Sequence, residues 1–381
     1  MEEIIRGAKS IKEAESLKGK RVLLRLDLNV PVLNGKVEDD FRIRKSIPTI
    51  NYLKERGAKV VIISHIWEDE SKTLKPVYDH LVEKIPLTFA QDCINKETQD
   101  AIEKMQEGDV ILLENLRLYE GETKNDINFA NELSRLADIY VNDAFAVSHR
   151  EHASLISLPK LLPSYYGLLF EDEIKNLSTV LNPSKPFLFI LGGAKFETKI
   201  PLIIEYLEKA DYVYVAGALA NDFFKVQGYE MGISKLSGKD YKLEDYLDRK
   251  NLILPKDVTV KNKDGIFVKK PSEVESDDMI LDIGVEAMIE LKELVSKSKF
   301  ILWNGPLGDY KKGFRDRTID LAKAIIDSPA KSVVGGGDTF AVISKLKLED
   351  EFDFMSTAGG ALLEFIYSGT LPGLEALKNQ A

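Results

Sequence analysis

The chain has 381 residues, too many for one hydrophobic core. A typical domain size of about 150 residues predicts two or three domains. Its 44% hydrophobic and 9% aromatic residues are typical of a globular protein. The 52 lysines and arginines against 62 aspartates and glutamates give a net charge of −10, which argues against nonspecific binding of nucleic acid. A basic cleft that attracts a small anion remains compatible with this charge.

The single cysteine, Cys93, excludes a disulfide framework and a cysteine-based zinc site within this chain. The four histidines form no HExxH pattern. The first 21 residues lack the apolar segment of a signal peptide, and no apolar run approaches the ~18 residues of a membrane span. We therefore expect a cytoplasmic protein without a membrane partner.

Short apolar runs alternate with longer segments of helical periodicity along the chain. The runs begin at Arg21, Lys59, Asp109, Asp138, Pro186, Asp211, Asn251, Lys299, Lys331 and Phe352. This alternation predicts an α/β fold whose parallel sheets are buried on both faces. A domain boundary is expected between His152 and Pro186, where a helical segment ends at the two prolines of NPSKP.

The residues that follow the predicted strands differ between the two halves of the chain. In an open parallel sheet, ligands bind outside the carboxyl ends of the strands. In the first half these ends carry polar residues, namely Arg25, Asp27, Asn29, His65, Glu114, Asn115, Arg117, Asn142 and Asp143. In the second half they carry Gly192, Gly193, Gly217, Asn304, Gly305, Gly335–Gly337, Gly359 and Gly360. The asymmetry predicts two domains with two different ligands.

The first half also gathers basic groups near these strand ends. They are Arg25, Arg42, His65, Arg117, His149, Arg150 and His152. Arginine suits bidentate capture of phosphate or carboxylate, so one interpretation is a shared pocket for a small polyanion. Ordinary surface arginines and structural ion pairs are the other. Asp27 and Asn29 either orient substrate hydroxyls or cap the turn after their strand. His149 and His152 are better interpreted as polar or anion-facing groups than as an acid–base or metal site.

The second half contains VVGGGDTF, a strand followed by glycines and a helix that starts near Asp338. Glycines let backbone N–H groups approach phosphate oxygens, and a helix N-terminus favours anions. Asp338 is either a plain N-cap, the commoner role, or a ligand of Mg²⁺, which prefers one or two carboxylates together with substrate phosphates. STAGGALLEF repeats the pattern of glycines before a helix.

The stretch LGGAKFETK places Lys195 and Lys199 four residues apart at the expected start of a helix. Residues at this spacing share a helix face, and each exposed cation there opposes the helix dipole by ~0.3–1 kcal/mol. A bound polyphosphate would reverse that sign, whereas two solvated lysines are the alternative. The chain has no Walker A, GxGxxG or GxSxG motif, which disfavours P-loop NTPases, protein kinases, Rossmann dehydrogenases and α/β-hydrolases.

Together these residues resemble phosphoglycerate kinase over nearly the whole chain. The motifs RLDLNVP, DDFRIR, LLENLR, YVNDAF with HREHAS, LGGAK, LWNGP, VGGGDT and STAGG occur in the order of that family. The resemblance implies two doubly wound α/β/α domains joined by a helix and hinge. It places a phosphoglycerate domain at 1–165, the helix and hinge at 166–185, a nucleotide domain at 186–355 and a segment returning to the first domain at 356–381.

The resemblance also implies the role of individual residues. Substrate contacts would come from Arg25, Asp27, Asn29, Arg42, His65, Arg117 and Arg150. Nucleotide contacts would come from Gly193, Lys195, Lys199, Gly217, Asn304, Gly335, Gly336, Gly337, Asp338 and Thr339, with Asp338 also serving Mg²⁺. The catalytic set would be Arg42, Lys199, Gly336 and Gly359, in which Arg42 and Lys199 stabilise the transferred phosphoryl group.

Three departures from the family pattern touch recognition. SHIWED stands where the family has SHLGRP, so Glu68 replaces an arginine and Asp69 adds a second acid. AGALAN replaces a triple glycine near the adenine, with Ala216 and Ala218 able to reshape that pocket. In WNGPLGDYKK, against WNGPxGVF in the family, Lys311 replaces the acidic acceptor of the ribose hydroxyls, and Asp309 is a candidate substitute.

The expected activity is Mg²⁺-dependent, reversible phosphoryl transfer between 1,3-bisphosphoglycerate and ADP, giving 3-phosphoglycerate and ATP in glycolysis and gluconeogenesis. Such transfer needs positioning and charge neutralisation, here through hinge closure that excludes water. We expect a monomer with small-molecule substrates and no nucleic-acid partner. Two alternatives stay open: an acyl-phosphate kinase for another acid or nucleotide, and a non-catalytic nucleotide-binding paralogue.

Overall fold

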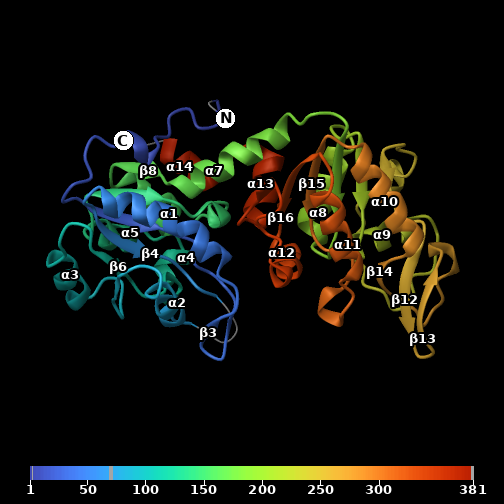
Figure 1. The fold of residues 1–381 in the computed structure, drawn as a ribbon, viewed down its shortest axis with the longest axis horizontal. Coiled ribbons are helices and arrows are strands. Elements are labelled where there is room, and N and C mark those ends of the chain that lie inside the picture. The colour runs from blue at the N-terminus through green and yellow to red at the C-terminus, as the bar shows by residue number, and fades with distance from the viewer. Residues whose placement is uncertain (2, 68–71, 379–381) are drawn as a thin grey trace. The chain divides into compact units, whose positions relative to one another are not determined.

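The computed structural model describes residues 1, 3–67 and 72–378, and Figure 1 traces its chain. The chain divides into two compact units. Unit 1 comprises Met1–Lys175 with Ser368–Ala381, and unit 2 comprises Asn176–Tyr367. The first division falls within helix α7 (Leu168–Leu177) and the second at the end of α13 (Gly360–Ser368).

Unit 1 contains a six-stranded sheet in which every pair of neighbouring strands is parallel. Its order is β5 (Thr88–Phe89), β6 (Val110–Leu112), β4 (Lys59–Ile63), β1 (Arg21–Arg25), β7 (Ile139–Asn142) and β8 (Ser164–Tyr166). A hairpin of β2 (Val32–Leu33) and β3 (Lys36–Val37) follows β1. The apolar residues of β1 and β4 are fully buried because helices cover a parallel sheet on both faces.

The helices of unit 1 connect these strands. They are α1 (Phe41–Glu55), α2 (Lys75–Leu81), α3 (Lys96–Glu103), α4 (Glu120–Thr123), α5 (Ile127–Ser134), α6 (Ala153–Ile156), most of α7 and α14 (Pro372–Lys378). Short 3-10 turns lie at Ile11–Glu13, Leu116–Leu118, Phe145–Val147 and Leu158–Lys160.

Helix α14 belongs to unit 1 although it comes last in the chain. It contacts α6 and β8, and Figure 1 shows it in red beside β8. Leu371, Leu374 and Leu377 are fully buried, and the N–H of Gly373 donates to Ser148 O at 2.8 Å. A Cβ atom on Gly373 would lie 2.9 Å from Ser148 Cβ, so glycine permits this close approach.

Unit 2 repeats the parallel architecture. Its six-stranded sheet has the order β11 (Leu252–Ile253), β10 (Tyr212–Val215), β9 (Phe187–Leu191), β15 (Phe300–Asn304), β16 (Lys331–Gly335) and β17 (Phe354–Met355). Its helices are α8 (Phe196–Tyr206), α9 (Ala218–Val226), α10 (Val285–Lys297), α11 (Asp316–Ile326), α12 (Gly337–Ile343) and α13. Its 3-10 turns are Ser178–Leu181, Leu243–Tyr246, Pro271–Glu273, η8 (Tyr310–Lys312) and Ser344–Leu346. The predicted α/β fold with parallel sheets is confirmed.

Unit 2 also contains a three-stranded antiparallel sheet that the sequence analysis did not predict. Its order is β13 (Gly265–Lys269), β12 (Val258–Asn262) and β14 (Met279–Ile283). The Asp264-Gly265 pair, where the turn after β12 enters β13, is a typical hairpin signal that could have revealed it. Among the described residues, no helix is long and apolar enough to cross a bilayer.

Candidate active site

Both parallel sheets reverse their strand order at one point. In unit 1 the chain builds outward from β1, first toward β4 and β6 and then toward β7 and β8. In unit 2 it builds from β9 toward β10 and β11, and then toward β15, β16 and β17. Ligands of doubly wound sheets bind at the carboxyl ends of the strands beside such a switch point. Most of the predicted site residues lie at or after the ends of β1, β4, β9, β15 and β16, while Arg117 follows β6, Arg150 follows β7, Gly217 follows β10 and Gly359 follows β17.

In unit 1, Arg25 is fully buried. Its Nε donates to Ser154 Oγ at 2.9 Å, and its Nη2 lies 3.2 Å from His65 Nδ1. Nη2 also lies 3.8 Å from the fully buried carboxylate of Glu122, which neutralises its charge, while Nη1 donates to Leu26 O. Arg25 therefore orients His65 through its contact with Nδ1.

Arg42, a residue of helix α1, contacts the loop after β1 through its side chain. Arg42 Nη1 donates to Asn29 O at 2.7 Å and lies 3.4 Å from Asp27 Oδ2. Asp27 Oδ1 accepts from the N–H of Asn29 at 3.2 Å, and Asn29 Oδ1 accepts from the N–H of Trp67 at 2.8 Å. Asp27 therefore stabilises the turn after its strand and also contacts Arg42. The predicted Glu68 and Asp69 lie outside the described residues.

The histidines of this region are neutral near pH 7. Burial, then Arg25 and Arg117, hold the pKa of His65 well below its ordinary value. Burial lowers the pKa of His152 to about 4, followed by the effects of Arg117 and Arg25. Burial and then Arg150 lower the pKa of His149 to about 4. The positive charge of this region therefore comes from its guanidinium groups.

Three buried nitrogens of the region have no hydrogen-bond partner among the described residues: Arg117 Nε, His149 Nδ1 and His152 Nδ1. Buried polar atoms without partners are rare in native proteins and call for an explanation. Burial and the neighbouring Arg150 and Arg25 lower the pKa of Arg117, which shows that the guanidinium groups repel each other. A bound polyanion would satisfy both the unpaired nitrogens and this excess of positive charge.

In unit 2, Lys199 lies in the first turn of α8 and its side chain is only 4% exposed. Its Nζ donates to Gly192 O at 2.8 Å and to Asn304 O at 3.4 Å, at the ends of β9 and β15. Burial is the main cause that lowers the pKa of Lys199 to about 7, with Lys195 contributing and Asp338 opposing. The alternative of two solvated lysines is therefore wrong for Lys199. Lys195 is the N-cap residue of α8.

Glycines bring the loops of unit 2 into backbone contact. Gly217 has φ of 62°, and a Cβ atom there would lie 2.6 Å from the N atom of Gly193. A Cβ atom on Gly305 would lie 2.3 Å from Gly192 O. The loops after β9, β10 and β15 therefore meet beside Lys199, with their peptide groups close together.

The glycine loop after β16 lies against Asn304. Gly336 has φ of 105°, and a Cβ atom there would lie 3.0 Å from Asn304 Nδ2. That nitrogen is buried and has no hydrogen-bond partner among the described residues. Gly337 has open space on its Cβ side. An unpaired amide beside a glycine loop at a sheet switch point fits the binding of a phosphate group.

The interpretation of Asp338 as a plain N-cap is wrong. The N-cap residue of α12 is Gly336, and Asp338 Oδ1 accepts from Tyr310 Oη at 3.1 Å. The neighbouring Thr339 is buried and accepts from the N–H of Gly305 through Oγ1 at 2.7 Å. Asp338 Oδ2 has no hydrogen bond among the described residues. One carboxylate oxygen is thus available for a cation such as Mg²⁺, which binds few carboxylates and completes its shell with phosphates and water.

Two predicted glycines differ in their surroundings. Gly335 ends β16 and is buried, with Leu362 Cδ1 only 2.5 Å from the position of a Cβ atom. Gly335 therefore serves close packing of α13 against the strand. Gly359 lies near the glycine loop after β16. A Cβ atom on Gly359 would lie 3.6 Å from the N atom of Gly337.

A cavity of about 480 Å³ lies in unit 2, and the residues that line it do not include Lys199, Asn304, Gly336 or Thr339. Of the predicted residues, Gly193, Lys195, Gly217 and Asp338 line it, together with Ala218, Asp309 and Lys311 of the departures from the family pattern. Ala216 is fully buried and does not line it. A larger groove of about 780 Å³ lies along β5 and α3 of unit 1, and none of the predicted site residues lines it.

Several lining residues were not predicted from the sequence. Tyr310 lies beside Asp338, and Phe224 on α9 adds an aromatic surface. Asp282 comes from the unpredicted antiparallel sheet, and burial raises its pKa to about 7. The hairpin signal at Asp264-Gly265 is the one feature of the sequence that points to this wall of the cavity.

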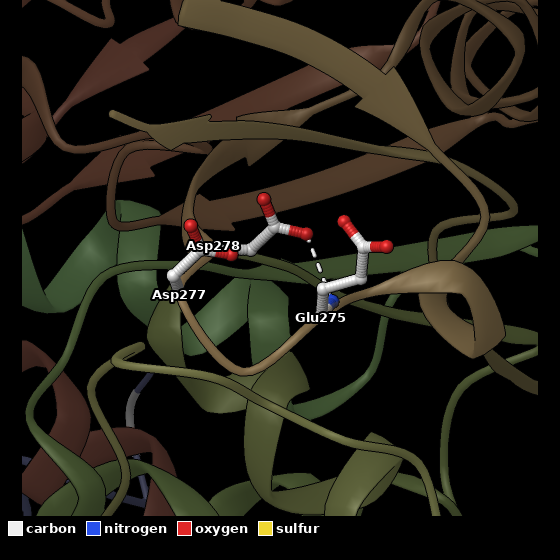
Figure 2. Close-up of side chains that lie close together, drawn as sticks. All are labelled: Glu275, Asp277 and Asp278. Atoms are coloured by element: carbon white, nitrogen blue, oxygen red, sulfur yellow. Dashed lines mark hydrogen bonds between the residues drawn. The ribbon is translucent and has the colours of Figure 1, made fainter. Parts of the chain in front are cut away.

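In the part of the chain that the structure describes, one cluster of acidic residues is compact enough to consider as a metal site, namely Glu275, Asp277 and Asp278 (Figure 2). Lys269 Nζ lies 2.7 Å from both Glu275 and Asp278, and these carboxylates raise the pKa of Lys269 to about 12. Asp278 also accepts from Asn262 Nδ2 at 2.8 Å. An ammonium group already supplies the positive charge here, so we assign no metal to this cluster.

Two doubly wound sheets, with a group of arginines at the strand ends of one unit and lysine and glycine residues without a Walker loop at those of the other, indicate a class: a two-unit α/β kinase for small molecules. The model of one family, described as phosphoglycerate kinase, matches residues 11–368. The chain belongs to the phosphoglycerate kinase family.

Curated relatives match over the full length. The chain is 41% identical over 385 residues to the phosphoglycerate kinase of Wolbachia sp. subsp. Brugia malayi, covering 95% of this chain and 96% of that protein. It is 41% identical over 388 residues to that of Dictyoglomus turgidum, covering 96% and 97%.

Solved structures agree. Phosphoglycerate kinase from Coxiella burnetii superposes with a TM-score of 0.80 at 35% identity, covering 97% of this chain and 98% of that one. The enzyme from Pyrococcus horikoshii OT3 gives 0.85 at 31% identity with the same coverage. The chain is a phosphotransferase with a carboxyl group as acceptor, and ATP and ADP are its co-substrates. These matches do not favour the two alternatives raised by the sequence.

Proposed function

We propose that the chain catalyses Mg²⁺-dependent, reversible phosphoryl transfer between 1,3-bisphosphoglycerate and ADP, with the glycerate bound by unit 1 and the nucleotide by unit 2. The observation that carries the proposal is Lys199, a buried amino group beside the unpaired amide of Asn304 and a loop of glycines. A cation is stable in such a position when an anion compensates its desolvation.

In unit 1, the guanidinium groups of Arg117 and Arg150 attract the phosphate of the glycerate. His65, held neutral and oriented by Arg25, offers a hydrogen bond without adding charge. Asp27 and Asn29 contact the substrate hydroxyl and carboxyl groups. Arg42 is anchored by Asn29 O through Nη1, and its side chain is 26% exposed, so it can neutralise the phosphoryl group in transfer.

In unit 2, Lys195, the glycine loop and Asn304 hold the nucleotide phosphates. Lys199 faces the transferred phosphoryl group from a site where preorganised charge acts strongly because little water screens it. Gly193 and Gly217 shape the cavity wall against the nucleoside. These groups position and neutralise, which is most of what catalysis of phosphoryl transfer requires.

Asp338 would hold Mg²⁺ through Oδ2, which has no hydrogen bond among the described residues. The ion would neutralise charge on the nucleotide phosphates when bound. Tyr310 occupies the other carboxylate oxygen of Asp338, so a single carboxylate oxygen faces the ion from this side chain. One carboxylate oxygen together with phosphate and water ligands is a typical set for Mg²⁺.

A coupled assay with 1,3-bisphosphoglycerate and ADP tests the activity on pure, folded protein. Turnover is expected with Mg²⁺ present and should disappear on addition of EDTA and return with excess Mg²⁺. Absence of turnover in both conditions would contradict the proposed reaction, whereas turnover that survives EDTA would contradict only the role of the metal.

A further inference from the structure

Tyr310 makes a contact whose purpose the proposed function does not explain. Its hydroxyl donates to Asp338 Oδ1 at 3.1 Å, which links η8, after β15, to the first turn of α12, after β16. A phenol in its ordinary protonated form has one O–H to donate, and Asp338 takes it.

The backbone that carries Tyr310 is held by its own hydrogen bonds. The N–H of Asp309 donates to Leu281 O at 2.7 Å, and Asp309 O accepts from the N–H of Phe314 at 3.1 Å. Asp309 Oδ1 accepts from the N–H of Lys312 at 3.3 Å and caps the turn. These hydrogen bonds hold the backbone on both sides of Tyr310, and they therefore help to fix the position of its hydroxyl group.

The loop after β15 and the start of α12 are joined a second time. The N–H of Gly305 donates to Thr339 Oγ1 at 2.7 Å, one residue beyond Asp338. Asp338 and Thr339 of α12 are thus both hydrogen-bonded to the segment that follows β15, Asp338 through its carboxylate and Thr339 through its hydroxyl group. A hydrogen bond to one oxygen of a carboxylate fixes its rotation and leaves the second oxygen for another partner.

We propose that Tyr310 is a positioning residue for the metal–nucleotide complex: its hydroxyl holds the carboxylate of Asp338 so that the second oxygen is ready to bind the cation. The inference rests on the proposed role of Asp338 toward Mg²⁺. Partners that orient a metal ligand typically contribute 10–100-fold to metal affinity.

The test is calorimetric titration of ADP into the wild-type protein and the Tyr310→Phe variant, with and without Mg²⁺. Phenylalanine keeps the aromatic wall of the cavity and removes only the hydroxyl. We expect the variant to bind Mg-ADP about tenfold more weakly and metal-free ADP as tightly as the wild type. Tyr367→Phe, a half-exposed tyrosine of α13 away from the cavity, is the matched control and should change neither affinity.

The double variant Tyr310→Phe/Asp338→Asn separates positioning from a general effect on the fold. If Tyr310 acts through Asp338, adding Tyr310→Phe to Asp338→Asn leaves the affinity for Mg-ADP unchanged. Equal weakening of ADP with and without Mg²⁺, or no weakening in either, overturns the inference. If Mg²⁺ fails to strengthen ADP binding even in the wild type, the proposed metal role of Asp338 fails first, and the role of Tyr310 with it.

Discussion

Lys199 is placed for binding an anion at the cost of the hydration of its amino group. A lysine loses hydration on burial, and two carbonyl oxygens restore only part of it. Its lowered pKa records this cost. Such a residue adds little to the stability of the free protein, and it stabilises a complex in which a negative charge binds beside it.

Lys199→Ala should therefore lower kcat more than it weakens ADP binding. Removing one preorganised donor from a transition state typically costs about 10²–10³-fold in kcat. Steady-state kinetics with 1,3-bisphosphoglycerate and ADP measures the effect, and Lys323→Ala, an exposed lysine of α11, is the control. Wild-type kcat in the Lys199→Ala variant would show that this ammonium is not used in the transfer.

The pKa of Lys199 makes nucleotide binding depend on pH. Between its lowered pKa of about 7 and the ordinary value of 10.5, the free protein holds Lys199 mainly neutral. A bound polyphosphate favours the ammonium and raises this pKa, so binding takes up a proton, and affinity falls as pH rises above about 7. Titrations of Mg-ADP at pH 8 in two buffers of different ionisation enthalpy should reveal this uptake. The uptake should be smaller in Lys199→Ala, and its absence in the wild type would contradict the assignment.

At the scale of the residue, the sequence indicated candidate residues but not their contacts. Lys199, Asn304 and Asp338 became candidates because charge and glycine patterns are local, and their roles stay predictions. That Arg25 is wholly buried, and that Asp338 binds a tyrosine instead of capping its helix, depend on neighbours distant in sequence. No local pattern contains this information.

Among the strands, those with a strong local sequence pattern could be predicted, and those without one could not. The apolar runs at Pro186 and Lys299 became β9 and β15, whose five residues are all buried, because continuous apolar runs are typical of central parallel strands. The two-residue strand β5 and the exposed strand β13 carry too weak a pattern to predict. The antiparallel sheet was missed for this reason, and with it one wall of the cavity.

The start of α9 provides a test at the scale of an element. Gly217→Ala should lower the free energy of unfolding by about 2 kcal/mol or more, because φ of 62° strains alanine and its Cβ atom would collide with Gly193. Gly228→Ala, with φ of 87° and open space around it, carries the strain without the collision and is the matched control. Urea denaturation compares the two. An equal loss in both variants would mean that the backbone contact between Gly217 and Gly193 is not tight.

For the whole molecule, the two units should respond to different ligands. We expect 3-phosphoglycerate to slow amide hydrogen exchange after β1 and β4 of unit 1, and Mg-ADP to slow it after β9, β15 and β16 of unit 2. Ligands that bind the native state suppress local opening at their site. Exchange measured by mass spectrometry with each ligand alone tests this assignment. Protection of unit 2 by 3-phosphoglycerate without any in unit 1 would reverse the roles of the units.

The fold class and the family could be predicted from sequence because ordered motifs extend over nearly the full chain, and both predictions are confirmed. The domain limits expected at 165, 185 and 355 came from motif positions, whereas contacts divide the chain within α7 and at the end of α13. The predicted ligand contacts stay predictions until substrates are bound.

Because helix α14 belongs to unit 1, the order in which the two units are translated differs from the order in which their cores can be filled. A ribosome makes unit 2 after most of unit 1, and only then adds the residues whose leucines fill the space beside α6 and β8. Until translation reaches this last helix, the earlier-made half of the protein leaves an apolar surface uncovered. Unit 1 therefore cannot complete its core before Leu371, Leu374 and Leu377 have been made, although most of its chain is translated before unit 2.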